Sequence, residues 1–283
     1  MWITAGILFL SACAPEYQSC PRTESQRPLE ITTAVMNGTL SPNITSLTVD
    51  RLGHAYLVDN DHWRVLALGS DGNFQYELPL PSQSCFVTAG YNHDGFCLVD
   101  DGNQRIVFFD SNGRRLKEIA YSNHRFRAGA MTQTGDLYLL DQLARMVVVF
   151  DRSGQQSRQF VLIPGSVGTT LQPTSIAVDQ TADVLMIADA SQNLLCAFSL
   201  WGNFRSRIEL SITAGPSAIA FDPGGRLWVC DRSGSQLVAG QQHAGDWKII
   251  GRTPADVPVA VSFGFSGNDY LLANGTLLSV IVK

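Results

Sequence analysis

The sequence lacks the runs of lysine or arginine with which nucleic-acid-binding proteins contact phosphate groups. Charged residues make up only 16% of the 283 residues, and the formal net charge is −5. The densest basic stretch, 113–117, contains three basic residues and fits a turn followed by a strand edge. We therefore expect no nucleic-acid partner. Hydrophobic residues account for 45% of the chain, which is ample for a folded core.

Long apolar runs are also scarce, and the only one extends from Met1 to Ala14. It is too short for a membrane-spanning helix, which needs about 20 residues, but it has the length of the hydrophobic region of a signal peptide. The run leads into Leu10-Ser11-Ala12-Cys13, which resembles the lipobox of bacterial lipoproteins. This resemblance implies cleavage before Cys13 and acylation of that cysteine. No lysine or arginine precedes the run, so either the terminal amine serves alone or the true start lies upstream.

The residues after Cys13 are polar and interrupted by proline, which predicts a tether. We expect a lipoprotein signal peptide at 1–12, a lipidated flexible tether at 13–28 and a folded domain at 29–283. Two or three acyl chains on one residue anchor a protein stably to a membrane. Ala14, rather than aspartate, follows the cysteine. By analogy with the proteobacterial sorting rule, we expect the protein at the periplasmic or extracellular side of the cell envelope, and at the outer rather than the inner membrane.

The folded region repeats a short motif six times, which is its strongest internal signal. Each copy is a run of apolar residues that ends in aspartate or asparagine, as in Gly95–Asp100 and Gly225–Asp231. Successive end positions are 41, 41, 48, 42 and 43 residues apart. These repeat-ending residues are Asp59, Asp100, Asp141, Asp189, Asp231 and Asn274.

Each repeat predicts four antiparallel strands. A first strand such as 44–49 precedes the apolar run, which is a second strand buried on both faces. A third strand such as 64–68 and a glycine-containing turn lead to a fourth strand such as 74–78. Four-stranded repeats of about 42 residues are typical of β-propeller blades. We therefore predict an all-β fold, a six-bladed β-propeller of four-stranded antiparallel blades.

The last repeat is one strand short, because only residues 275–283 follow Asn274. The strand-like segment 29–35 precedes the first repeat and has no partner there. We predict that this N-terminal strand supplies the outer strand of the last blade, since ring closure removes exposed sheet edges. The 48-residue spacing contains an insertion at 162–171, which is a candidate contact loop.

The repeats resemble the NHL-repeat family of six-bladed propellers. The shared features are the apolar–Asp ending of the second strand, an arginine that opens the third strand (Arg64, Arg105, Arg145), and the Phe-Asp-x-x-Gly turn at 109–113 and 150–154. The segment Asp222–Asp231 also resembles gluconolactonase-like and streptogramin-lyase-like propellers. The resemblance implies an architecture that binding scaffolds, lactonases and lyases share, so it does not select a function.

The repeat-ending residues allow two interpretations. A ring of carboxylates at one end of the second strands would suit a hard cation, which prefers oxygen ligands. Alternatively, each carboxylate accepts backbone N–H bonds or pairs with the following arginine of its own blade. A repeated residue usually has a repeated structural role, which favours the second interpretation. We therefore predict no cofactor and no metal site.

Catalytic patterns are missing as well. No glutamate falls at an axial place, and the sequence has no His-x-His, His-x-x-x-His or Cys-x-x-Cys motif. We therefore predict no catalytic residues. Candidates for a binding face are acidic residues outside the regular repeat positions, and the histidine and tryptophan beside them, with Trp63 as an anchor. These candidates are Asp61, His62, Trp63 and Asp101.

These observations favour a membrane-anchored cell-envelope lipoprotein whose propeller binds a protein partner or an envelope polymer, and whose role is that of a scaffold rather than an enzyme. A structural subunit of a larger envelope complex is not distinguished from this. The alternative is a metal-dependent lactonase- or lyase-type enzyme with a divalent cation such as Ca²⁺ in the axial channel. Three or more converging oxygen or imidazole ligands in that channel would favour the enzyme, and a channel that is apolar or whose polar groups pair with one another would favour the scaffold.

Overall fold

The fold is known here from a computed structural model. It describes residues 30–32, 44–82, 85–90, 94–164, 171–179, 181–210, 212, 215–231, 236–243, 246–254, 258–263, 269–273 and 276–281. Throughout these ranges the chain forms strands and turns but no helix. It follows that none of the described segments is a helix long and apolar enough to span a membrane.

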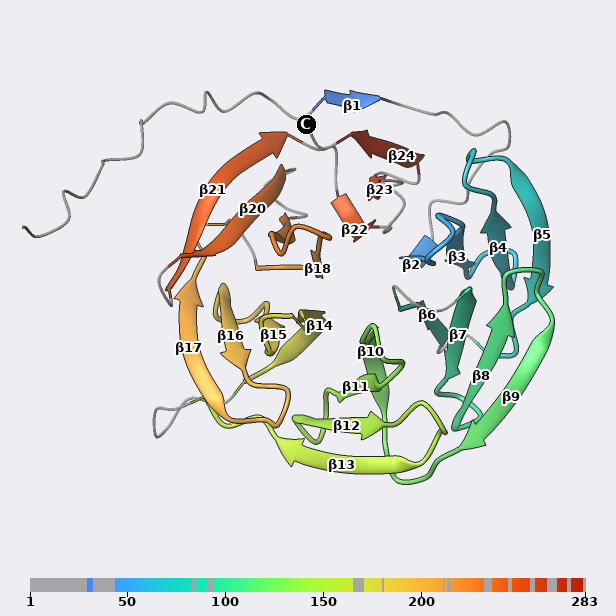
Figure 1. The fold of residues 1–283 in the computed structure, drawn as a ribbon, viewed down its shortest axis with the longest axis horizontal. Coiled ribbons are helices and arrows are strands. Elements are labelled where there is room, and N and C mark those ends of the chain that lie inside the picture. Colours follow the sequence, from blue (N-terminus) through green and yellow to red (C-terminus); the bar gives the residue numbers. More distant parts are fainter. Residues whose placement is uncertain are drawn as a thin grey trace, which may run out of the picture.

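The strands form six sheets of four antiparallel strands arranged around a common axis (Figure 1). This confirms the predicted six-bladed β-propeller. Blade 1 contains β2 (Ile44–Val49), β3 (Ala55–Asp59), β4 (Arg64–Leu68) and β5 (Phe74–Pro79). Blade 2 contains β6 (Cys85–Thr88), β7 (Gly95–Asp100), β8 (Arg105–Asp110) and β9 (Arg115–Ala120). Blade 3 contains β10 (Phe126–Met131), β11 (Leu137–Asp141), β12 (Met146–Phe150) and β13 (Gln156–Val161).

The remaining blades follow the same order from the axis outward. Blade 4 contains β14 (Pro173–Asp179), β15 (Val184–Asp189), β16 (Leu194–Phe198) and β17 (Phe204–Glu209). Blade 5 contains β18 (Ala218–Phe221), β19 (Leu227–Asp231), β20 (Gln236–His243) and β21 (Asp246–Pro254). Blade 6 contains β22 (Pro258–Phe263), β23 (Asp269–Ala273) and β24 (Thr276–Ile281), and its outer strand is β1 (Glu30–Thr32).

The N-terminal strand closes the ring, as the incomplete last repeat predicted. β1 pairs antiparallel with β24, and Ile31 lies opposite Val280. Figure 1 shows β1 outside β24 at the rim of blade 6. The first strand of each blade contacts the first strand of the next, and β2 also contacts β22. The first and last blades are therefore joined both at the axis and through a strand from the opposite end of the chain.

The burial pattern explains why the second strands are continuously apolar. Every residue of β3, β7, β11, β15 and β19 is buried. Each of these strands is an inner strand of its blade, and the two faces of the blade are covered by the two neighbouring blades. Outer strands such as β5 alternate between exposed and half-buried residues, as a strand with one solvated face does. Side chains of adjacent blades interdigitate, as those of blades 2 and 3 do around Phe126.

The strand directions define two faces of the disc. Turns between first and second strands and between third and fourth strands lie on one side, such as 50–54 and 132–136. We call this the hairpin face. Turns between second and third strands, such as 60–63 and 142–145, lie on the other side with the connections between blades. We call this the crossover face, and it carries the ends of the second strands.

Candidate functional site

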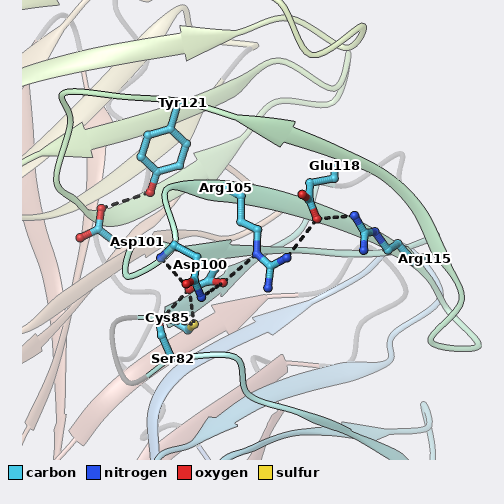
Figure 2. A network of polar contacts seen from close by, with 9 residues as sticks. Ser82, Cys85, Asp100, Asp101, Arg105, Arg115, Glu118 and Tyr121 are labelled. Carbon is cyan, nitrogen blue, oxygen red and sulfur yellow. Dashed lines mark hydrogen bonds and ion pairs between the residues drawn. The ribbon is translucent and has the colours of Figure 1, made fainter.

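The repeat-ending aspartates of blades 1 and 2 are buried and fully engaged. Asp59 accepts hydrogen bonds from His62 Nδ1 (2.9 Å) and Arg64 Nε (3.1 Å). Asp100 accepts bonds from Ser82 Oγ (2.7 Å) and Arg105 Nε (2.9 Å), which Figure 2 shows around the carboxylate. Arg105 in turn pairs with Glu118. Each carboxylate thus connects its own blade's second and third strands.

These contacts change the acidity of both carboxyl groups. Burial alone would raise the pKa of Asp100, but hydrogen bonds from Ser82, Asn103 and Arg105 outweigh it and lower the pKa below its ordinary value. Burial would likewise raise the pKa of Asp59, but the hydrogen bonds that Asp59 accepts from its neighbours outweigh burial and lower the pKa below its ordinary value. Both groups are therefore held as carboxylates by donors inside the fold.

The corresponding residues of the later blades have similar surroundings. Asp141 accepts a backbone bond from Ala144 N (2.9 Å) and contacts His124 Nδ1 (3.2 Å). Asp189 accepts bonds from Gln172 N (2.8 Å) and from both the N–H and the hydroxyl of Ser191. Asp231 is fully buried, and Asn274 lies outside the described residues. Across the described ranges, no three His, Cys, Asp or Glu side chains come together as a metal site.

Asp101 lies inside the molecule rather than on a binding face. The residue is only 5% exposed. It accepts hydrogen bonds from Phe126 N (2.9 Å) and from the Tyr121 hydroxyl (3.1 Å; Figure 2), and Arg125 pairs with it at 3.5 Å. The sequence analysis placed Asp101 among the candidate contact residues. The structure instead uses it to join blade 2 to the start of blade 3.

The other three candidates remain together in one turn of the crossover face, between β3 and β4. His62 is half-exposed and bonds to Asp59. Trp63 is 48% exposed, and its φ of 53° places its backbone in the left-handed region. Its carbonyl accepts a bond from Leu80 N (2.7 Å), which holds the turn against the end of the outer strand. Asp61 is exposed beside them.

A second feature of the crossover face was identified from the sequence only in part, through the insertion at 162–171, of which 165–170 lie outside the described residues. Leu143 is 78% exposed in the turn between β11 and β12, and Ile163 is 68% exposed after β13. Leu162 N bonds to Arg145 O (2.8 Å), so the turn and the beginning of the insertion lie side by side. Val161 is exposed next to them. We call Leu143, Val161 and Ile163 the blade 3 apolar patch.

In the part of the chain that the structure describes, the axial channel does not contain the ligands that the enzyme alternative requires. The cavity has a volume of about 120 Å³ and is lined by residues of the first strands of all six blades. The polar side chains among the described lining residues are those of Thr48, Thr88 and Ser262, and the rest are aliphatic, aromatic or glycine. No carboxylate or imidazole lines this part of the channel, so the described residues do not fit a divalent cation there.

The hairpin face carries buried aspartates that the sequence analysis overlooked. Asp50 accepts bonds from the Tyr56 hydroxyl (2.9 Å) and from Gly95 N of the next blade (3.0 Å). Asp222 accepts bonds from Trp228 Nε1 (2.9 Å) and Arg226 Nε (2.6 Å). Both belong to an Asp-x-x-Gly-x-x-aromatic pattern. This pattern was a sequence signal for a hydrogen-bonded turn before the second strands of blades 1 and 5.

Among the described residues, the cysteines are buried and free. These are Cys85, Cys97, Cys196 and Cys230. Burial raises the pKa of the Cys85 and Cys196 thiols to about 11, and it also raises the pKa of Cys97 and Cys230. These cysteines are core side chains and not nucleophiles, because reactivity needs an accessible thiolate.

Comparison with known proteins identifies relatives by fold. No family model matches the sequence, and neither does any curated protein. A solved streptogramin B lyase is similar with a TM-score of 0.64 and 11% identity, over 91% of this chain and 99% of the lyase. Virginiamycin B lyase from Staphylococcus aureus has a TM-score of 0.60 and 14% identity, over 90% of this chain and 88% of the lyase.

A third similar chain belongs to a solved structure of the mitotic checkpoint complex. The TM-score is 0.62 and the identity 10%, over 98% of both chains. At such identities the likeness concerns the fold and not the activity. These proteins and this chain share the β-propeller architecture.

Proposed function

We propose that this chain is a lipid-anchored propeller of the bacterial cell envelope that binds a protein partner through its crossover face. Its blades are of the NHL type, by the repeat pattern of the sequence. The anchor is Cys13, which follows the apolar run in a lipobox-like sequence. The tether at 13–28 lets the disc approach a partner away from the membrane.

The blade 3 apolar patch is the observation that carries this proposal. Leu143 and Ile163 are more than two-thirds exposed on adjoining segments of one face. Large apolar side chains that gather on a surface are typical of protein-interaction sites. Trp63 is a further half-exposed aromatic on the same face, and tryptophan is enriched among residues that dominate binding energy.

The rest of the fold supports a binding role. The carboxylates near the crossover face are engaged in hydrogen bonds within the blades, as Asp59 and Asp100 are. They hold the turns in place, and a rigid scaffold lowers the entropy cost of presenting surface side chains. A similar propeller occurs in the mitotic checkpoint complex, so the architecture is compatible with a place in a protein assembly.

The experiment is chemical cross-linking on intact cells, followed by affinity purification of the tagged full-length chain and mass spectrometry. The test variant is Leu143→Ser, and its matched control is Leu116→Ser on outer strand β9, where Leu116 is also exposed. We expect one dominant cross-linked protein, and about a tenfold lower recovery of it with Leu143→Ser, because central apolar contacts dominate binding. Leu116→Ser should behave as the unmodified protein.

The anchor is tested separately with Cys13→Ala. This variant should move from the membrane fraction to the soluble fraction while the purified propeller keeps its thermal stability. Equal recovery of the partner with Leu143→Ser and Leu116→Ser would overturn the proposed binding face. Membrane retention of Cys13→Ala would overturn the lipid anchor, and failure to recover any specific protein would overturn the binding role.

A further inference from the structure

A pocket on the hairpin face is unrelated to the crossover-face surface described above. It has a volume of about 410 Å³, within the range of about 300–1,000 Å³ that small-molecule sites occupy. It lies where the first strands of blades 3, 4 and 5 end. Its lining residues are Met131, Thr132, Gln133, Val178, Asp179, Thr181, Ala182, Phe221, Asp222, Pro223, Gly224 and Gly225.

The inner wall of this pocket is apolar and continuous with the axial channel. Met131, Val178 and Phe221 line both the pocket and the channel. Pro223 belongs to the turn that follows β18 and adds apolar surface on the blade 5 side. An apolar ligand body is therefore accommodated at the mouth of the channel, where its burial is favourable.

The two carboxylates of the pocket are in different states. Asp222 is buried, and its charge is compensated by Arg226 Nε at 2.6 Å and by Trp228 Nε1 at 2.9 Å. Asp179 accepts two backbone bonds, from Thr181 N (2.9 Å) and Ala182 N (3.1 Å), and both involve Oδ1. Within the described part of the chain, Asp179 has no ion-pair partner.

The second oxygen of Asp179 faces the turn of the neighbouring blade. A methyl group built on Gly225 would lie 3.4 Å from Oδ2. Gly225 has a φ of +76°, which favours glycine, and the missing side chain leaves Oδ2 uncovered on that side. Oδ2 is thus available to a donor that enters the pocket between blades 4 and 5.

The charges around the pocket favour a cation at Asp179. Asp183 is close by in sequence, but it is paired with Arg205 and therefore does not compete with Asp179 for a bound cation. Arg226, which follows Gly225 in the sequence, is paired with Asp222. Lys117 and Arg152 line a separate hollow of about 210 Å³, which shares Thr132 and Gln133 with the pocket. No lysine or arginine is among the residues that line the 410 Å³ pocket.

We propose that this pocket binds a small amphipathic amine. The ammonium group donates to Asp179 Oδ2, and the apolar body lies against Met131, Phe221 and Pro223 at the mouth of the channel. A charge-assisted hydrogen bond gives the amine its advantage over a neutral ligand of the same shape. The apolar wall gives it an advantage over a fully hydrated cation such as ammonium itself.

The test compares three probes with the same phenylethyl body on the purified full-length chain by isothermal titration calorimetry. The probes are phenethylamine, phenethyl alcohol and hydrocinnamate, which place an ammonium, a hydroxyl or a carboxylate at the same end. We expect phenethylamine to bind about tenfold more tightly than the alcohol, and hydrocinnamate to bind more weakly than both, because charge-assisted bonds are roughly twice as strong as neutral ones.

Asp179→Asn is the key variant, since the side chain keeps the Oδ1 acceptor for Thr181 N and Ala182 N and loses only the charge. Asp71→Asn is its matched control, because Asp71 Oδ1 likewise accepts a backbone bond in a hairpin-face turn (Asn73 N, 3.0 Å) but lies outside the pocket. A second variant, Ala182→Trp, fills the pocket from an exposed position. Thermal melting of each variant confirms that it is folded.

We expect Asp179→Asn to reduce phenethylamine binding to the level of the alcohol, Asp71→Asn to leave it unchanged, and Ala182→Trp to weaken all three probes. Equal affinity for amine and alcohol, or the tightest binding by hydrocinnamate, would overturn the assignment of Asp179. Absence of binding by all three probes, or binding that Ala182→Trp leaves intact, would overturn the pocket as the site.

Discussion

The carboxylate of Asp101 in blade 2 accepts a 2.9 Å hydrogen bond from the backbone N–H of Phe126, the first residue of blade 3. A turn of one blade therefore holds the first strand of the next. Asp50 makes a comparable link on the opposite face, because it accepts a bond from Gly95 N in blade 2. Buried carboxylates thus join blades 1 and 2 at the hairpin face and blades 2 and 3 at the crossover face, in addition to the apolar cores.

Replacing Asp101 should destabilise the propeller. In Asp101→Ala, Phe126 N and the Tyr121 hydroxyl lose their acceptor, and an unsatisfied buried donor costs about 1–3 kcal/mol. We expect the free energy of unfolding in urea to fall by about 2–4 kcal/mol. The control is Glu209→Ala, whose side chain is 81% exposed and which should change the value by less than about 0.5 kcal/mol. Similar losses in both variants would contradict the blade-linking role.

Acid should destabilise the fold through Asp100. Its folded pKa is lowered, while an unfolded aspartate titrates near about 3.9. The group therefore contributes stability above the unfolded pKa, and this contribution is lost as the pH falls through the folded pKa. Asp100→Asn should be less stable than the unmodified protein at neutral pH and should lose less stability between about pH 5 and about pH 3. Urea unfolding across this range measures both effects, and a parallel pH profile would refute the expectation.

Gly95 should not tolerate a side chain. Its φ is +123°, and a methyl group there would lie 2.2 Å from the carbonyl oxygen of Phe109, a distance that requires the backbone to move. Gly95→Ala is expected to prevent soluble folding or to lower the melting temperature by more than about 10 °C. Gly72 also has a positive φ, of +76°, but a methyl group there would have nothing within 4 Å, so Gly72→Ala should cost only about 1 kcal/mol of conformational strain. Equal effects would mean that the steric contact is not decisive.

The buried thiols should be unreactive in the folded protein. In a variant with serine at both Cys13 and Cys20, Ellman's reagent should label no cysteine at about pH 8, since the four thiols are buried and their pKa values are raised. All four should react in concentrated guanidinium chloride. Rapid labelling of the native protein would show that one of the blade cores opens to solvent.

Most of the architecture was predictable from local sequence pattern. The apolar second strands identified the blades, because a strand covered on both faces contains apolar residues at consecutive positions, as in Leu137–Asp141. The boundaries of β2 and β4 agree with the expected strands 44–49 and 64–68. Closure by the N-terminal strand followed from counting strands, since an incomplete last blade leaves one edge unpaired.

The site could be predicted only in part. Trp63 and His62 were selected because they lie in a turn between repeated strands, and both side chains are about half-exposed on the crossover face. Asp101 was misplaced because its position beside Asp100 does not reveal that Phe126 N would lie 2.9 Å from its carboxylate. Leu143 was missed for the same reason, since its exposure depends on how the turn lies beside Ile163.

The sequence by itself thus determined the class of fold, the number of blades and the way in which the ring closes, because repeat length and apolar periodicity are local properties of the chain. Only the tertiary structure decided which carboxylates link blades, which apolar side chains gather on one face, and that Asp179 and Gly225 meet across a pocket. The contacts between blades depend on how one blade packs against the next, and they join residues 25 positions apart, as Asp101 and Phe126 are, or 45 apart, as Asp50 and Gly95 are.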